Sequence, residues 1–175
     1  MELHLQLPQG GVGTAFPDEG TCHGRLIAVR WPEGPECPRC SSRDAGHLEA
    51  RKIYHCRACL KQFTSTSSTI FHRARTGLQS WFRAGELIIL KRIYPGYMEK
   101  LTAHSFSEHL GISHEAADRM MQIMHRDLSN SAESLLLKCI CTREGPSRPR
   151  GIEHGGREHY DWLSDLSLKK LRREH

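Results

Sequence analysis

Two short cysteine motifs, CPRC at residues 37–40 and CRAC at residues 56–59, are separated by fifteen residues and decide the fold of this sequence. Each Cys-x-x-Cys can turn so that both thiolates face one ion, and two such turns supply the four tetrahedral ligands of zinc. The spacing therefore predicts a zinc ribbon that holds one structural Zn²⁺. A catalytic zinc is not expected, because four thiolates leave no open position for water. The predicted ligands are Cys37, Cys40, Cys56 and Cys59.

The residues around the second motif favour two short strands, IYH at 53–55 and KQFT at 61–64. His55 stands directly before Cys56 and carries a possible ligand atom. The matching register of the two motifs favours the cysteine, so we predict that His55 is a strand residue.

The chain of 175 residues is 38% hydrophobic with a mean hydropathy of -0.55, which favours several small folding units over one large core. Its strongly apolar run, LIIL at residues 87–90, is too short to cross a bilayer, and MELHLQLP at residues 1–8 is not typical of a signal peptide. We therefore expect a cytoplasmic, nucleoid-associated protein with no membrane partner. In a reducing compartment, seven cysteines favour metal binding over disulfides.

The basic charge is concentrated in one block. The formal net charge is +5, and residues 31–92 hold eleven basic and five acidic side chains. A basic block around a zinc ribbon is typical of a surface that binds a polyanion. The alternative is an ordinary solvated, charged face.

The sequence after the ribbon favours helices. TGLQ at residues 76–79 matches a capping box and predicts a helix from there to about residue 92. A further pair is expected at residues 101–110 and 114–128, because Gly111 suits a tight turn and Ser113 is a good N-cap. The buried positions expected for a helix-turn-helix are Phe106, Leu110, Ile112, Ala117 and Met120. An ordinary helical hairpin is the alternative.

These patterns nominate residues that contact double-stranded DNA. Residues 93–141 carry four basic and six acidic side chains, so the basic ribbon is expected to supply most phosphate contacts. The phosphate-contact candidates are Lys52, Arg57, Lys61, Arg73 and Arg75. The base-edge candidates at the start of the second helix of the pair are His114, Arg119 and Gln122.

The remaining cysteines and the tail are less informative. Cys22, Cys139 and Cys141 could join a second metal site only if the chain ends meet, and otherwise they are ordinary buried residues. Residues 142–156 are typical of an unstructured basic linker. Residues 160–173 could form a short helix, either docked on the body or loosely packed.

Several motifs occur in an order that resembles the N-terminal region of zinc-ribbon transposases from bacterial and archaeal insertion sequences. They are FPDE at residues 16–19, RWPEG at 30–34, CPRC at 37–40, YHCRACLKQF at 54–63, STIF at 68–71, WF at 81–82, LGIS at 110–113 and RM at 119–120. The resemblance covers about residues 16–128 and implies binding of the terminal inverted repeats of a mobile element.

In that family, an RNase H-like domain with an Asp/Glu triad and two divalent metals follows and performs strand transfer. Such a domain is much longer than the segment that follows the expected helix-turn-helix. We therefore expect a truncated, DNA-binding half of a transposase that lacks strand-transfer activity alone and has no catalytic residues. Its expected partners are DNA and either a second copy of itself or a catalytic transposase polypeptide. The alternative is a stand-alone zinc-ribbon/helix-turn-helix transcriptional regulator or protein-interaction module.

The expected fold is small α+β, with a zinc-ribbon β-hairpin module, a helical helix-turn-helix region and a loosely ordered C-terminal tail. The expected segments are a lead-in at residues 1–30, the zinc ribbon at 31–72, the helical region at 73–130, and a linker and tail at 131–175.

Overall fold

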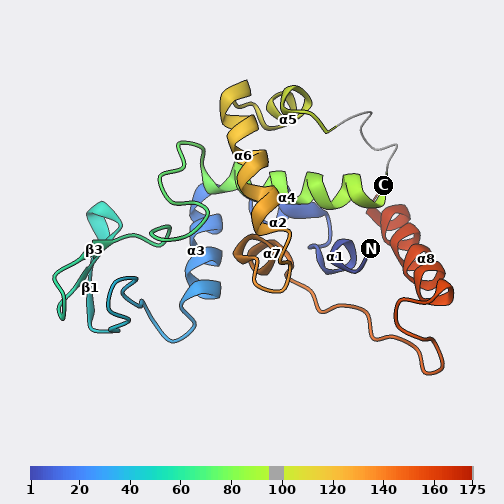
Figure 1. Ribbon diagram of the computed structural model, residues 1–175, viewed down its shortest axis with the longest axis horizontal. Helices are drawn as coiled ribbons and strands as arrows, with labels where there is room; N and C mark the ends of the chain where they lie inside the picture. Colours follow the sequence, from blue (N-terminus) through green and yellow to red (C-terminus); the bar gives the residue numbers. More distant parts are fainter. Residues whose placement is uncertain (95–100, 175) are drawn as a thin grey trace.

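A small antiparallel sheet lies at one end of the molecule and the helices fill the rest, as the ribbon of this computed structural model shows (Figure 1). The structure describes residues 1–94 and 101–174. The expected small α+β fold is confirmed. The elements follow in the order α1 (Glu2–Gln6), α2 (Gly11–Ala15), α3 (Glu19–Arg30), β1 (Ala45–Leu48), the 3-10 helix η1 (Glu49–Arg51), β2 (Ile53–Cys56), β3 (Gln62–Phe63), α4 (Leu78–Ile93), α5 (Ala103–Leu110), α6 (His114–Asp127), α7 (Leu135–Ile140) and α8 (Arg157–Glu174).

The sheet has the strand order β1-β2-β3, and both pairs are antiparallel. The central strand β2 and the short strand β3 lie where the sequence predicts strands, and Tyr54 pairs with Phe63 between them. Strand β1 was not predicted, because AGHL lacks both β-branched residues and an alternating pattern.

The ribbon has a core of its own, separate from that of the helices. Its buried members are Trp31, Cys37, Tyr54, Cys56 and Phe63. Trp31 meets Tyr54 edge to face, with ring centroids 5.1 Å apart, and Phe63 stacks on Tyr54 at 5.5 Å. Five buried residues are too few to stabilise a module of this size, so the ribbon depends on its metal for folding.

Helix α4 is the centre of the helical body and contacts α1, α2, α3, α5 and α7. Phe82 on this helix is fully buried, and it packs edge to face on Phe16, with ring centroids 5.2 Å apart. At Gly85 a side chain would lie 2.8 Å from Ile140 Cδ1 and 3.1 Å from Leu136 Cδ2. The absence of a Cβ at this position therefore lets α7 approach α4 closely.

The segment before the ribbon is part of this body. Residues 1–30 form α1, α2 and α3, which bury Leu7, Val12, Cys22 and Leu26 in the same core as α4. Helix α3 then leads directly to Trp31 in the ribbon core. The lead-in thus joins the two cores.

Helix α4 begins at Leu78, close to the predicted start, but the predicted capping box is wrong. Its N-cap is Gly77, which offers no side chain. Instead, Glu19 at the start of α3 accepts hydrogen bonds from the backbone amides of Leu78 at 2.7 Å and Gln79 at 3.1 Å. A carboxylate from another helix therefore satisfies the amides that a local cap would otherwise serve.

Helices α5 and α6 form the predicted pair. Gly111 ends α5 in the left-handed conformation, with φ 64°, and Ser113 caps α6 by accepting from the Ala116 amide at 3.2 Å. The expected inward positions include Phe106, Ala117 and Met120, which are fully buried, whereas Leu110 and Ile112 are half-buried against the same core. The inward face of the pair therefore packs on the helical body.

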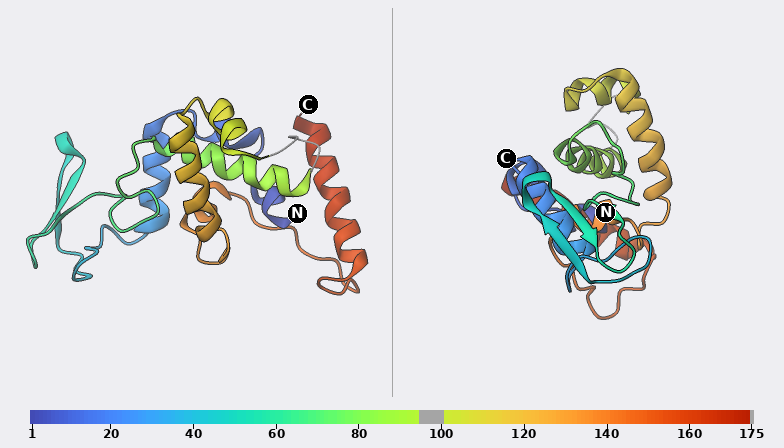
Figure 2. Two further views of the ribbon diagram at one scale, coloured as in Figure 1. Left: turned by 45° about the horizontal axis from the view of Figure 1, so that its top comes forward. Right: turned by 90° about the vertical axis from the view of Figure 1, so that its left-hand side faces the viewer.

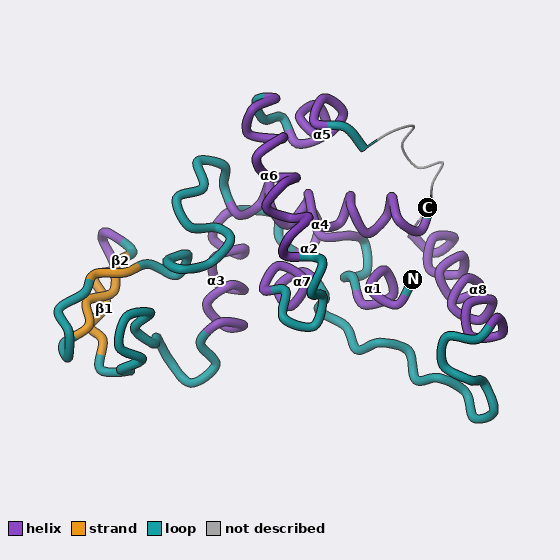
Figure 3. The backbone as a smooth tube through the Cα atoms, viewed as in Figure 1, coloured by secondary structure: helices purple, strands orange, loops and turns teal. Residues whose placement is uncertain are grey.

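The tail is more regular than its composition indicates. Residues 142–156 run along the body without a helix or strand, and α8 then forms at the end opposite the sheet (Figures 2 and 3). Leu163 is buried, and Lys170 Nζ donates to the carbonyls of His4 and Leu7, each at 2.8 Å. Helix α8 is therefore attached to α1 and the residues that follow it. Among the described residues, no helix is long and apolar enough to span a membrane.

The interhelix cap leads to a test of stability. We expect Glu19→Ala to lower the free energy of unfolding by about 1–2 kcal/mol, because the first amides of α4 lose their acceptors. Urea denaturation followed by circular dichroism measures this change. Asp165→Ala, at an exposed acid of α8, is the control and should change stability far less. Equal effects of the two substitutions would contradict the assigned role of Glu19.

Candidate metal centre and nucleic-acid interface

The two cysteine motifs fold into matching turns. The Ser41 amide donates to the carbonyl of Cys37 at 2.9 Å, and the Leu60 amide donates to the carbonyl of Cys56 at 3.0 Å. Ser41 and Leu60 both adopt the left-handed conformation, with φ 55° and 59°, which reverses the chain just after each motif. Because the two turns have the same backbone bonds, they present their thiols in the same way.

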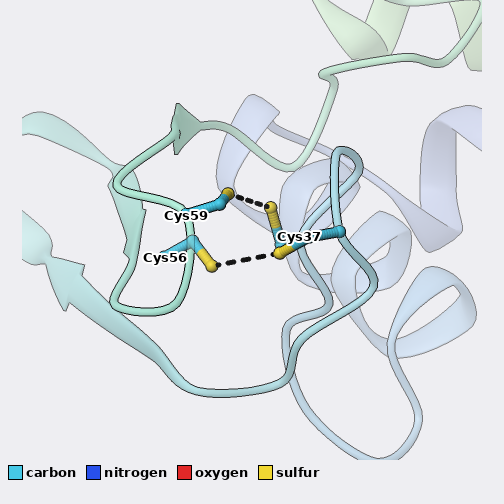
Figure 4. A group of neighbouring side chains, drawn as sticks. Cys37, Cys56 and Cys59 are labelled. Atoms are coloured by element: carbon cyan, nitrogen blue, oxygen red, sulfur yellow. Dashed lines mark hydrogen bonds between the residues drawn. The ribbon is translucent and has the colours of Figure 1, made fainter.

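The four thiols converge between these turns (Figure 4). Cys37 Sγ lies 3.6 Å from Cys59 Sγ, and Cys40 Sγ lies 3.6 Å from Cys56 Sγ. All four sulfurs lie within 4.8 Å of one another. Sulfurs placed tetrahedrally about 2.3 Å from one zinc ion would be about 3.8 Å apart. The donor set and its geometry therefore fit a structural Zn²⁺, as the sequence predicts.

The backbone of the first turn favours the thiolate form of Cys37. Burial alone would raise the pKa of this thiol, but hydrogen bonds from the backbone amides of Arg39 and Cys40 and from the thiols of Cys59 and Cys40 together lower the pKa to about 7. A thiol with this pKa gives up its proton to a metal at little cost near neutral pH. Within the same cluster, the neighbouring thiols raise the pKa of Cys40 to about 12, so the proton is shared unequally among the four sulfurs.

His55 lies within β2 and is half-buried, with Gln62 opposite it on β3 and Gly46 opposite it on β1. It is not among the residues whose donor atoms cluster with the four sulfurs. Its position is that of a strand residue.

The basic candidates on the ribbon are exposed, but they are not equivalent. Arg57 Nη1 lies 2.9 Å from Asp44 Oδ1, so an ion pair offsets part of its charge. Lys52 sits at the hairpin turn between η1 and β2, and Lys61 follows the second cysteine motif. Both lysines can approach a polyanion, whereas Arg57 would first have to leave its carboxylate.

The loop between β3 and α4 brings its two basic candidates close to α6. Arg73 and Arg75 line a hollow of about 280 Å³ together with Arg119 near the start of α6. The sequence pattern indicates these three arginines separately, and the structure brings them together at one place. His72 and Trp81 line the same hollow. The sequence pattern did not indicate either residue as part of a site, and it placed Trp81 on the core face of its helix.

The other two candidates lie elsewhere on α6. His114 and Gln122 are exposed and do not line the hollow. Gln122 Nε2 donates to Asp118 Oδ2 at 2.8 Å, so an acid one turn earlier orients the amide. The outward face of α6 therefore combines amide, imidazole and acidic groups.

The remaining cysteines have the properties of core residues. Cys22 and Cys139 are fully buried, and Cys141 is half-buried. Burial raises the pKa of Cys22 to about 11, that of Cys139 to about 12 and that of Cys141 to about 11. These thiols are protonated near neutral pH and are therefore poor nucleophiles, and among the described residues none of the three lies in a cluster of possible metal ligands.

A second group of donor atoms joins the two ends of the described chain. Glu2, His154 and His159 have donor atoms within 4.8 Å of one another. The buried His159 accepts a hydrogen bond from the Gly155 amide at Nδ1, and its Nε2 lies 3.6 Å from Glu2 Oε1. Both ring nitrogens are thus already engaged, which fits a structural link between α1 and α8.

The metal centre leads to a direct test. We expect the wild-type chain to hold one zinc ion and Cys37→Ser to lose it, because three thiolates cannot complete the tetrahedral set. Metal loss should increase hydrogen exchange across β2 and β3 and leave most helical circular dichroism intact, because the helices have a separate core. Cys141→Ser is the matched control and should retain zinc. A wild-type protein without stoichiometric zinc would contradict the assignment.

Comparison with known proteins agrees with this geometry. Residues 17–62 match the family of transposase zinc-ribbon domains. The chain is 22% identical over 160 residues to an uncharacterized protein in the transposable element ISH50 of Halobacterium salinarum; the match covers 83% of this chain and 52% of the relative. The chain thus spans about half the length of that relative. No solved structure matches the chain. The resemblance to transposase zinc ribbons is confirmed at residues 17–62, and the chain is a transposase-related, zinc-binding protein.

Proposed function

We propose that this protein binds double-stranded DNA and recognises the terminal repeats of a mobile element in transposition. The observation that carries the proposal is the placement of Arg73 and Arg75, from the loop that follows the transposase-type ribbon, beside Arg119 on α6. Cations from two segments then face the same partner, as a surface that binds a polyanion requires.

In this proposal α5 and α6 act as a helix-turn-helix. Helix α6 is the element that enters the major groove, because its inward side is buried and its outward side carries the polar groups. Gln122 is suited to an adenine edge, since its amide offers one donor and one acceptor and Asp118 holds it in place. His114 lies at the first residue of the helix, where a base edge would be met first. Lys52 and Lys61 on the ribbon would reach phosphates further along the duplex.

We assign strand cutting and joining to no residue of this chain. In the proposal a catalytic transposase polypeptide supplies those steps, and this protein, alone or with a second copy of itself, holds the DNA. The protein would then be found in the cytoplasm on the nucleoid. The single-chain role is recognition, which uses the zinc ribbon, the loop that carries Arg73 and Arg75, and α6.

One observation favours a second candidate function. Glu115 and Asp118 are exposed on the same helix as His114 and Arg119, so α6 has a mixed face that a protein partner could also match. In that case the chain would be a zinc-ribbon regulator or interaction module. Such a role predicts weak duplex binding and no preferred DNA sequence.

Salt dependence tests the main proposal. We expect the zinc-loaded full chain to bind a labelled duplex with an affinity that falls steeply as salt rises. Each phosphate neutralised contributes about -0.9 to the slope of log K against log[salt]. Fluorescence anisotropy between low and high salt measures the slope. Weak binding with a slope near zero would favour the protein-interaction module instead.

Sequence selection tests the role of α6. Duplexes selected from a random pool should share a preferred sequence, and Gln122→Ala should relax that preference at one base position, because the variant lacks the amide. Arg126→Ala is the control on the same helix; it removes an exposed charge near the far end of α6 and should leave the preference unchanged. If the two variants select the same duplexes as the wild type, Gln122 does not read a base.

A further inference from the structure

The hollow between the loop at residues 70–76 and the first turns of α6 has the properties of an anion site. Its basic lining comes from two segments, with His72, Arg73 and Arg75 on the loop and Arg119 on the helix. Among the described lining residues, Glu115 is the one acidic side chain. With histidine neutral, the lining therefore carries a formal charge of +2, concentrated in a space of about 280 Å³.

These cations are not neutralised within the protein. In the part of the chain that the structure describes, Arg73, Arg75 and Arg119 form no ion pair. On the ribbon, by contrast, Arg43 pairs with Glu33 and Arg57 pairs with Asp44. Three arginines without a carboxylate partner at one hollow favour an anion there.

Helix α6 adds a further favourable field. It is a helix of 14 residues, and its N-cap Ser113 also lines the hollow. Ser113 satisfies the Ala116 amide at 3.2 Å, and the other first-turn amides have no partner within the helix. The positive end of the helix dipole therefore lies at the hollow, as in many phosphate sites.

Trp81, at the wall of the hollow, carries a buried hydrogen-bond donor. Trp81 lines the hollow and is only 3% exposed, yet among the described residues its Nε1 has no hydrogen-bond partner. The indole N–H is a donor only, so it lacks an acceptor. Buried donors are almost always satisfied, so this indole N–H is open to an acceptor that enters the protein at this wall.

The loop that carries the cations is held by ring packing and by backbone hydrogen bonds. Phe71 is buried, and its ring meets that of Trp81 edge to face at 5.5 Å. Two successive turns follow in the backbone. The His72 amide donates to the Thr69 carbonyl at 3.0 Å, and the Ala74 amide donates to the Phe71 carbonyl at 3.2 Å. Arg73 itself has φ 55°. These contacts fix the path of the backbone up to Ala74, next to the two arginines.

We propose that this hollow is a phosphate-binding site that takes one backbone phosphate of the duplex bound by α6. The inference rests on the proposed function and makes it more specific. It assigns Arg119 to the phosphate backbone, in place of the base edge that the sequence pattern indicated. A volume of about 280 Å³ is ample for a phosphodiester group. A phosphate fixed here would set the register of α6 along the groove.

The test uses the zinc-loaded full chain and follows the indole N–H signals by ¹⁵N NMR. Trp81→Phe identifies the Trp81 signal among those of the three tryptophans. We expect this signal to move on addition of duplex DNA, because Nε1 gains an acceptor. In parallel, replacing Arg73, Arg75 and Arg119 with alanine should weaken duplex binding for all sequences alike and reduce the salt slope by about 1. Arg83→Ala, at an exposed arginine of α4, is the matched control and should leave the Trp81 signal responsive.

The possible outcomes separate this site from the general DNA-binding proposal. If duplex binds but the Trp81 signal stays still and the triple variant keeps its salt slope, the phosphate site is overturned and DNA binding stands. An altered sequence preference in Arg119→Ala would return that residue to base reading and would also overturn the assignment. A third measurement follows the Trp81 signal during titration with inorganic phosphate. If duplex does not bind, both proposals fail, and a Trp81 signal that moves with inorganic phosphate alone would identify a free-phosphate site instead.

Discussion

The four cysteine thiols that meet between two matching turns are the interaction on which the ribbon, and the placement of the loop that leaves it, depend. They hold a ribbon whose apolar core consists of Trp31, Cys37, Tyr54, Cys56 and Phe63. Two of these five residues are metal ligands, so removal of the ion takes away both the cross-link and part of the core. The free energy of metal binding is thus part of the free energy of folding in this segment.

The ribbon in turn positions segments that lie outside it. Arg30, at the end of α3, lies over the Trp31 ring at 4.8 Å and donates to the Ser65 carbonyl at 2.6 Å. This single side chain therefore links the end of α3, the ribbon core and the start of the loop that leads to α4. Burial lowers the pKa of Arg30 from its usual value, yet the group retains its charge at any physiological pH. The loop that carries Arg73 and Arg75 thus starts from a fixed point at the ribbon and ends at the capped start of α4.

Local signals in the sequence were sufficient for the parts of the fold that local chemistry decides. The cysteine spacing predicts the metal ligands, and Gly111 with Ser113 predicts the turn between α5 and α6, because each pattern acts within a few residues. The cap of α4 could not be predicted in this way, since Glu19 lies 59 residues before the amide of Leu78 that it serves. Helices α1 and α2 have five residues each and are stabilised by packing on the body, so they have little periodicity of their own. The sequence also could not predict that Arg73, Arg75 and Arg119 lie close together, because their proximity depends on how the loop and α6 pack.

The proximity of these three arginines changes what the charge pattern implies about function. Along the sequence, residues 93–141 are net acidic, which argues against α6 as a DNA-facing helix. In space, the start of α6 lies beside two arginines that belong to the basic block of residues 31–92. The electrostatic potential at a surface depends on charges within roughly a Debye length of about 8–10 Å and not on their order along the chain. A helix with acidic side chains can therefore face a polyanion when its neighbours supply the cations, and one of those acids, Asp118, orients the amide of Gln122.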